Sequence, residues 1–295
     1  MCFIFYYQYP FLDKIWNLYD EFNETTDNLN NEKEDYNGVC KVIKEQAPDK
    51  KEWYNNLCIK LIRNLGTLSF ENDKTKYNSE RCKNLNSWLY YIIKDHEVNQ
   101  DIITNIFDES NKLMGDENIR HQCSNYLYKD KYNDPDKIIK LINLEDYMKD
   151  FLSILQDNSA NNHCLCRKFI FECANIYREM NNIYCSGQTR NSSTKSDTCY
   201  QLQIFQTFFT SYVSTKEKTI GKLPSLYAKD NENIPICASD AGKQELEQGK
   251  KPELESNGAD QSSSPKKIRI STAIGTMAGI PPFLALIYKV NIMYT

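Results

Sequence analysis

Eleven cysteines are spread over this 295-residue chain, and none of them lies beyond Cys237. No C-x-x-C pair occurs, and only Cys164 and Cys166 stand close together. A structural zinc site needs two such close pairs at a matching distance. Cysteines spaced this widely are typical of disulfides that join separate helices or strands, which form in an oxidising compartment. The spacing therefore predicts a cross-linked fold.

The odd number of cysteines leaves at least one thiol outside any intrachain pair, and Cys2 is the candidate. We expect the others to form disulfides. The alternative is free buried thiols, because cysteine also serves as a small core residue. The spacing leaves the connectivity open. The cysteines predicted to be paired are Cys40, Cys58, Cys82, Cys123, Cys164, Cys166, Cys173, Cys185, Cys199 and Cys237.

An uncharged, mostly apolar segment lies near the C-terminus. Residues 270–288 read ISTAIGTMAGIPPFLALIY, which is 19 residues without a charge. At about 1.5 Å per residue such a helix is ~28 Å long, enough to cross the hydrocarbon core of a bilayer. A buried core helix is the alternative, but core helices of this length usually have a polar face. We predict a single transmembrane helix from Ile270 to Tyr288.

Small residues and prolines mark this predicted span. Gly275 and Gly279, with Ser271 before them, place small side chains on one helix face, a pattern found where membrane helices pack closely. Pro281 and Pro282 remove two backbone donors, which membrane helices tolerate when other groups satisfy the freed carbonyls.

The composition divides the chain into four parts. Residues 1–237 form a cysteine-rich body, and residues 238–269 form a polar linker, or stalk, that we expect to be disordered because it lacks aromatic residues. The predicted span follows at 270–288, and 289–295 is a short tail. The apolar segment Met1–Leu12 lacks the basic start and the cleavage site of a secretory signal.

The body shows helical periodicity in several segments, and alternating strand patterns are scarce. The fold class predicted is all-α, a disulfide-stabilised multi-helix ectodomain. At 134–155, Asp134 is expected to cap a helix that Pro135 begins. The apolar positions are Trp53, Leu57, Leu61, Leu65 and Leu68; Leu85, Trp88, Leu89, Ile92 and Ile93; Ile102, Ile103, Ile106 and Phe107; Ile138, Ile139, Ile142 and Phe151; Cys166, Phe169, Ile170, Cys173, Ala174, Tyr177 and Met180; and Leu202, Phe205, Phe208 and Phe209.

The sequence offers no catalytic, cofactor or metal site. The net charge of −4 and the pI near 5.6 argue against a nucleic-acid binder. Phosphate-loop, dinucleotide, zinc-protease and nucleophile-elbow motifs are absent. His163 beside Cys164 and Cys166 is more simply a loop histidine next to disulfide cysteines than a metal site. Asn23 and Asn191 match the glycosylation acceptor pattern. We therefore predict no enzyme activity and no small-molecule substrate.

Several motifs occur in the order found in one protein family. Residues 58–65, CIKLIRNL, resemble a cysteine-led K-L-x-R-N-L helix, and residues 81–91, RCKNLNSWLYY, resemble a block of cysteine followed by L-N-x-W-L-Y. Cys166–Cys185 is similar to a later cysteine-rich helix with an I-Y pair. Cys199, with Leu202 and Phe205, is similar to C-x-x-L-x-x-F. Residues 275–289 resemble a membrane segment that runs into Y-K, although the sequence after Lys289 departs from the usual pattern.

These motifs identify the chain as similar to the Plasmodium interspersed repeat proteins, specifically the Vir-type variant antigens. The resemblance implies an antigen exported to the infected erythrocyte or its surface membrane, with roles in antigenic variation, host interaction and adhesion. Its partners would be a membrane and a host or parasite protein. The alternative is a tail-anchored adaptor that faces the cytosol. The basic residues Lys266, Lys267 and Arg269 before the span favour this alternative, because basic flanks tend to stay cytoplasmic.

Overall fold

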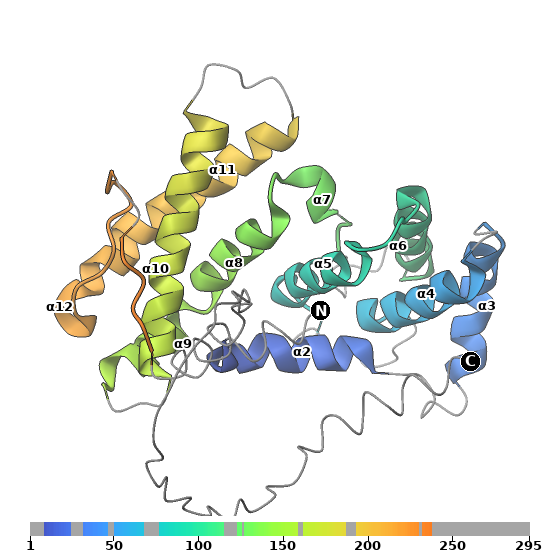
Figure 1. Cartoon of the computed structure of the whole chain (residues 1–295). Coiled ribbons are helices and arrows are strands. Elements are labelled where there is room, and N and C mark those ends of the chain that lie inside the picture. Colours follow the sequence, from blue (N-terminus) through green and yellow to red (C-terminus); the bar gives the residue numbers. More distant parts are fainter. Residues whose placement is uncertain are drawn as a thin grey trace, which may run out of the picture. The chain divides into compact units, whose positions relative to one another are not determined.

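The computed structural model describes residues 9–24, 32–46, 50–67, 77–114, 123–125, 127–158, 162–186, 193–229 and 232–237. All of them belong to one compact unit that spans residues 1–247. Within these ranges the chain is helical and contains no strand, so the all-α prediction is confirmed (Figure 1).

The predicted span at Ile270–Tyr288, the linker at 238–269, the tail and Cys2 lie outside the described residues. Of the helices that the structure does describe, none has both the length and the hydrophobicity needed to cross a membrane.

The described helices fall into two groups in chain order. The first group is η1 (Pro10–Leu12), α2 (Asp13–Asn23), α3 (Glu32–Glu45), α4 (Lys51–Leu65), α5 (Ser79–Ile93) and α6 (Gln100–Met114). The second group is α7 (Tyr128–Lys131), α8 (Pro135–Asp146), α9 (Met148–Gln156), α10 (His163–Met180), η3 (Asn181–Cys185), α11 (Ser193–Phe208), η4 (Phe209–Val213), η5 (Ser214–Lys216) and α12 (Glu217–Ile220).

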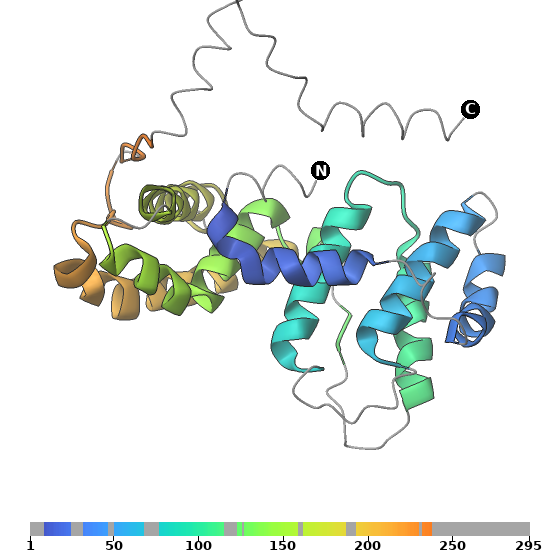
Figure 2. The ribbon, with the colours of Figure 1, turned by 90° about the horizontal axis from the view of Figure 1, so that it is seen from below.

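Helix α2 packs across α4 and α5 (Figures 1 and 2). Its apolar residues Ile15, Trp16, Tyr19 and Phe22 follow helical spacing and are buried. The Phe22 ring meets the Trp88 ring of α5 edge-on, with centroids 5.8 Å apart. The buried face of α2 therefore seals the core that α4 and α5 begin.

Most of the predicted apolar positions of α4 and α5 are in the core, while Ile92 and Ile93 at the end of α5 are partly buried. Leu57, Leu61 and Leu65 are buried on α4, as are Leu85, Trp88 and Leu89 on α5. Trp53 is only partly buried, because it lies near the start of α4 and packs against Tyr54 and His96. Leu68 lies outside the described residues.

Helix α4 ends in a left-handed glycine. Gly66 has φ +75°, its N–H donates to the Arg63 carbonyl, and the Thr67 N–H donates to the Ile62 carbonyl. This pair of bonds is the Schellman arrangement, which satisfies carbonyls at a helix end. The Thr67 hydroxyl then lies 2.6 Å from the buried Ser110 hydroxyl of α6. The left-handed glycine thus ends α4 and places Thr67 in contact with α6.

The helix predicted over 134–155 differs from the observed structure in two respects. It divides at Tyr147 into α8 and α9, because the Tyr147 side chain turns to α5, where its hydroxyl accepts from Asn84 and donates to Glu80. Asp134 does not cap α8: it has φ +49°, and its carboxylate accepts from the Tyr184 hydroxyl instead. A cap residue needs extended backbone to reach its helix, and Asp134 is left-handed.

Helix α10 is central to the second half of the fold, in contact with α8, α9 and α11. Tyr9, which precedes η1 and α2, is joined to α10 by a partly buried polar trio. The Tyr9 hydroxyl donates to the Glu172 carboxylate of α10, and Lys140 of α8 donates to both. The Lys140 ammonium also lies 4.5 Å from the centre of the Tyr9 ring. This trio joins the N-terminal segment to the C-terminal half.

We expect Gly66→Ala to destabilise the protein. A residue with a Cβ at φ +75° costs about 1–2 kcal/mol, and the added Cβ would lie 2.4 Å from the Tyr77 ring. The matched control is Gly38→Ala, because Gly38 is an exposed position of α3 with nothing within 4 Å of an added Cβ. That change should stabilise by about 0.5–1 kcal/mol. Urea denaturation followed by circular dichroism checks both, and equal effects would contradict this account of Gly66.

Candidate functional site

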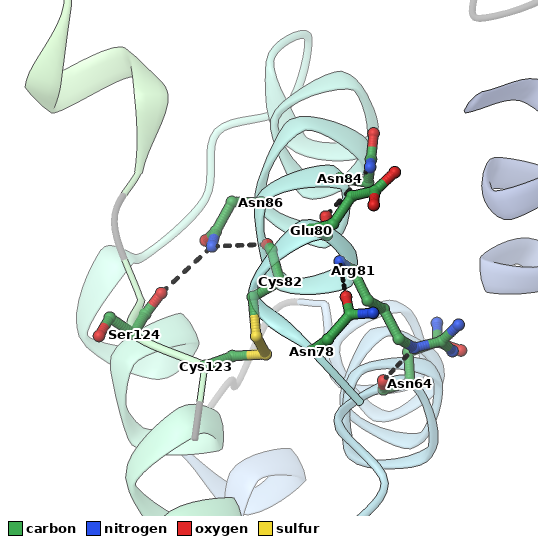
Figure 3. The surroundings of a disulfide bond; sticks show 9 residues. All are labelled: Asn64, Asn78, Glu80, Arg81, Cys82, Asn84, Asn86, Cys123 and Ser124. Carbon is green, nitrogen blue, oxygen red and sulfur yellow. Dashed lines mark hydrogen bonds between the residues drawn. A yellow bond between two sulfur atoms is a disulfide. The ribbon is translucent and has the colours of Figure 1, made fainter. Parts of the chain in front are cut away.

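The motifs at 58–65 and 81–91 come together at the C-terminal end of α2. Arg63 and Asn64 lie in the last turn of α4, and Arg81 lies in the first turn of α5. We call these three residues and the α2 terminus the motif junction. Figure 3 shows its α4–α5 side beside the Cys82–Cys123 disulfide.

Arg63 and Asn64 satisfy the carbonyls at the end of α2. The Arg63 guanidinium donates to the carbonyls of Glu21, Phe22 and Glu24, and the Asn64 amide donates to the Phe22 carbonyl at 2.9 Å. The last carbonyls of a helix have no partner within it, and that end carries partial negative charge. Partial burial lowers the pKa of Arg63. A cation with several donors is well suited to this position.

Arg81 fills the space between the three helices. Its side chain is 7% exposed, and its Nη2 lies 3.1 Å from the Glu21 carboxylate. Its Nε donates to the Asn64 carbonyl, and its guanidinium lies 4.7 Å from the centre of the Phe22 ring. A buried charge is tolerated only when it is paired and hydrogen-bonded, and Arg81 meets both conditions. Its donors therefore serve the fold.

The other polar side chains of α5 are also used within the protein. Asn78 caps the helix by accepting from the Arg81 N–H at 2.9 Å. Asn86 donates to the Cys82 carbonyl and to the Ser124 carbonyl, next to the Cys82–Cys123 disulfide (Figure 3). The buried polar residues of this motif thus bind backbone groups. The motif specifies helix packing.

Four disulfides join eight of the cysteines predicted to be paired. Two of them connect helices or segments of the first half, and two connect segments of the second half. The pairs are Cys40–Cys58, Cys82–Cys123, Cys164–Cys237 and Cys185–Cys199.

Cys166 and Cys173 are free thiols, so the prediction that they form disulfides is wrong. Both are buried on one face of α10, seven residues apart, which on a helix separates their Cα atoms by about 10 Å and is too far for a disulfide. Their sulfurs face the carbonyls of Phe151 and Lys140. Burial raises the pKa of Cys166 to about 12 and raises that of Cys173 as well. They act as small core residues.

A pocket of about 560 Å³ lies between the start of α4, the α5–α6 connection and α7. Several of its polar groups have partners within the protein. Lys50 donates to the Glu97 carbonyl, and the Tyr54 hydroxyl accepts from the Asn99 N–H. His96 packs against the Trp53 ring. No nucleophile and general base are paired among the described residues that line it.

The remaining sequence candidates do not gather into a site. Cys164 is in a disulfide, and the described residues contain no group of three or more His, Cys, Asp or Glu side chains placed to hold a metal ion. The Asn23 amide donates to the Tyr19 carbonyl, and its oxygen accepts from Trp88. The Asn23 side chain of this glycosylation pattern therefore forms a contact between α2 and α5. His121 and Asn191 lie outside the described residues.

Arg81→Gln should lower the free energy of unfolding by about 2–3 kcal/mol, because it leaves the Asn64 carbonyl and Glu21 without their partner. The control is Lys83→Gln on the same helix. Lys83 pairs with Asp146 at 2.7 Å, but both side chains are partly exposed, so a loss of at most about 1 kcal/mol is expected. Chemical denaturation of both variants measures the difference. Similar losses would contradict a special role for Arg81.

The thiols of Cys166 and Cys173 should resist alkylation in the native protein and react only after unfolding. Burial and a raised pKa both disfavour the reactive thiolate. Mass spectrometry after iodoacetamide treatment, with and without guanidinium but without reductant, gives the measurement. The eight paired cysteines should stay unmodified under both conditions. Rapid native labelling at position 166 or 173 would show that α10 is not packed as described.

Comparison with known proteins gives one family. The family model described as "Plasmodium vivax Vir protein" matches residues 13–286. Neither a curated protein nor a solved structure matches the chain. The matched range includes the motif junction, the four disulfides and all but the last two residues of the C-terminal apolar segment, and it covers most of the sequence. The chain belongs to the Plasmodium Vir family, and so, at the level of the family, to the variant surface antigens.

Proposed function

We propose that this chain is an exported variant surface antigen without enzyme activity, tethered to a membrane by residues 270–288 and displayed at or near the surface of the infected erythrocyte. Family membership supports the antigen assignment. Four disulfides in one helical unit carry the argument for display, because stable disulfides are rare in reducing compartments. The uncharged length of 270–288 supports the tether.

The way the fold is stabilised suits an antigen whose surface varies. The apolar core, Asn64 and Arg81 of the motif junction, and the disulfides Cys40–Cys58 and Cys82–Cys123 are buried. Substitutions on exposed surface away from such features usually change stability by less than about 0.5 kcal/mol. Exposed helix faces and connections can therefore change while the fold persists. Contact with a host protein, including adhesion, would use those exposed faces.

Labelling of intact infected erythrocytes tests the display. We expect an amine-reactive biotin that cannot cross membranes to modify exposed lysines, such as Lys218 and Lys222, equally in intact and fully permeabilised cells. A parasite cytosolic protein serves as the control and should be labelled only after permeabilisation. Labelling of the chain that requires permeabilisation of the erythrocyte membrane would overturn surface display.

Peptide mapping without reduction tests the compartment. Thiols are blocked at lysis, and the four disulfide-linked peptide pairs should be recovered from the parasite's own protein. A tail-anchored adaptor in the cytosol would instead yield the same eight cysteines in alkylated form. That result would favour the adaptor and overturn the antigen proposal for this member.

A further inference from the structure

Helix α11 carries apolar side chains on two faces. One face is buried and consists of Leu202 and Phe205, continued by Phe209 and Val213 of η4. The second face points outward. Its four members are spaced four residues apart, and we call them the α11 stripe: Tyr200, Ile204, Phe208 and Tyr212.

The α11 stripe is exposed at its start and partly buried at its end. Tyr200 is 66% exposed and Ile204 is 38% exposed. Phe208 and Tyr212 are partly buried, and their rings stack with centroids 5.9 Å apart. This stacking shows that the stripe continues in line from α11 into η4. A helix with apolar residues on both sides normally packs on both sides.

Charged side chains are missing from this part of the chain. Residues 198–215 contain no Asp, Glu, Lys or Arg, although 26% of the chain is charged. The stripe is bordered by the uncharged residues Gln203, Thr207 and Ser211. The centres of protein–protein interfaces are rich in aromatic residues and poor in charged ones. The face therefore has the composition of an interface core.

Opposite charges stand at the two ends of the stripe. Asp197 lies one turn before Tyr200, and Lys216 lies one turn after Tyr212, with its ammonium 5.1 Å from the centre of the Tyr212 ring. Within the described part of the chain, neither residue forms an ion pair. The helical run thus has an acidic end, an uncharged aromatic middle and a basic end.

We propose that the α11 stripe binds the same stripe of a second copy of this chain, with the two helices antiparallel about a two-fold axis. An antiparallel pair places Asp197 of each copy next to Lys216 of the other. Two equivalent pairs of opposite charge therefore form, one at each end of the contact. A two-fold interface must be self-complementary in this way. From Asp197 to Lys216 the contact is about 28 Å long at about 1.5 Å per residue. One pair of helices of this length buries a small interface, which suits a weak, reversible dimer.

A charge swap tests the pairing. Sedimentation velocity of the full chain in mild detergent measures the dimer dissociation constant. Asp197→Lys and Lys216→Asp alone should each weaken the dimer by about tenfold, because each turns two attractions into two repulsions. The double variant should return to within about twofold of the parent. A chain that stays monomeric, single variants without effect, or a double variant without recovery would each overturn the proposal.

Cross-linking shows whether the stripe itself is the contact, apart from any association through residues 270–288. Ile204→Cys lies within about three residues of the expected two-fold axis, so a short bifunctional thiol reagent should cross-link the two copies. Leu113→Cys on α6 is the matched control, because Leu113 is apolar and 50% exposed but lies on another helix, and it should not cross-link. Ile204→Asp should abolish the α11 contact while circular dichroism stays unchanged. Equal cross-linking at 113 and 204, or a dimer that survives Ile204→Asp, would overturn the assignment.

Discussion

The C-terminal carbonyls of α2 impose the constraint on which the first half of the fold depends. Helix α2 ends against α4 and α5, so its last carbonyls need hydrogen-bond donors from other parts of the protein. Arg63 and Asn64 provide those donors, and Arg81 joins the Asn64 carbonyl to Glu21. Because each group faces a partner on another helix, the register of all three helices is fixed together. Phe22 can then pack on Trp88, and the left-handed Gly66 turns the chain towards α6.

Apolar spacing was sufficient to predict the helices whose buried faces are continuous. The stripes on α4, α5, α6 and α10 all lie in the core. The burial of Arg81 could also have been inferred, since it lies four and seven residues before Leu85 and Trp88 on the same face. The positive charge of Arg81 argued against its burial, because arginine is rarely buried unless it is paired. Its partner Glu21 lies sixty residues away, and no local pattern connects the two.

Other features depended on contacts that no local pattern contains. Asp134 and Pro135 matched a helix start, but Tyr184 from another helix holds the Asp134 carboxylate. Tyr147 broke the predicted long helix because its hydroxyl reaches α5. The spacing of Cys166 and Cys173 already excluded a disulfide between these two residues. Whether either could pair with another cysteine depended on which cysteines the fold brings close together. Helices α2 and α3 were not among the predicted segments, although Tyr36, Cys40 and Ile43 of α3 follow helical spacing and are buried.

The Cys164–Cys237 disulfide determines how mechanical load would pass through the molecule. It joins the last described residue of the C-terminal segment to the first turn of α10 across 73 residues. Tension applied to the chain beyond Cys237 would cross this covalent bond directly into α10. The segment between the two cysteines, which contains most of α10 together with α11 and α12, is bypassed, and the tension continues into the chain before Cys164. A pull on the chain from beyond Cys237 would therefore leave the α11 surface folded.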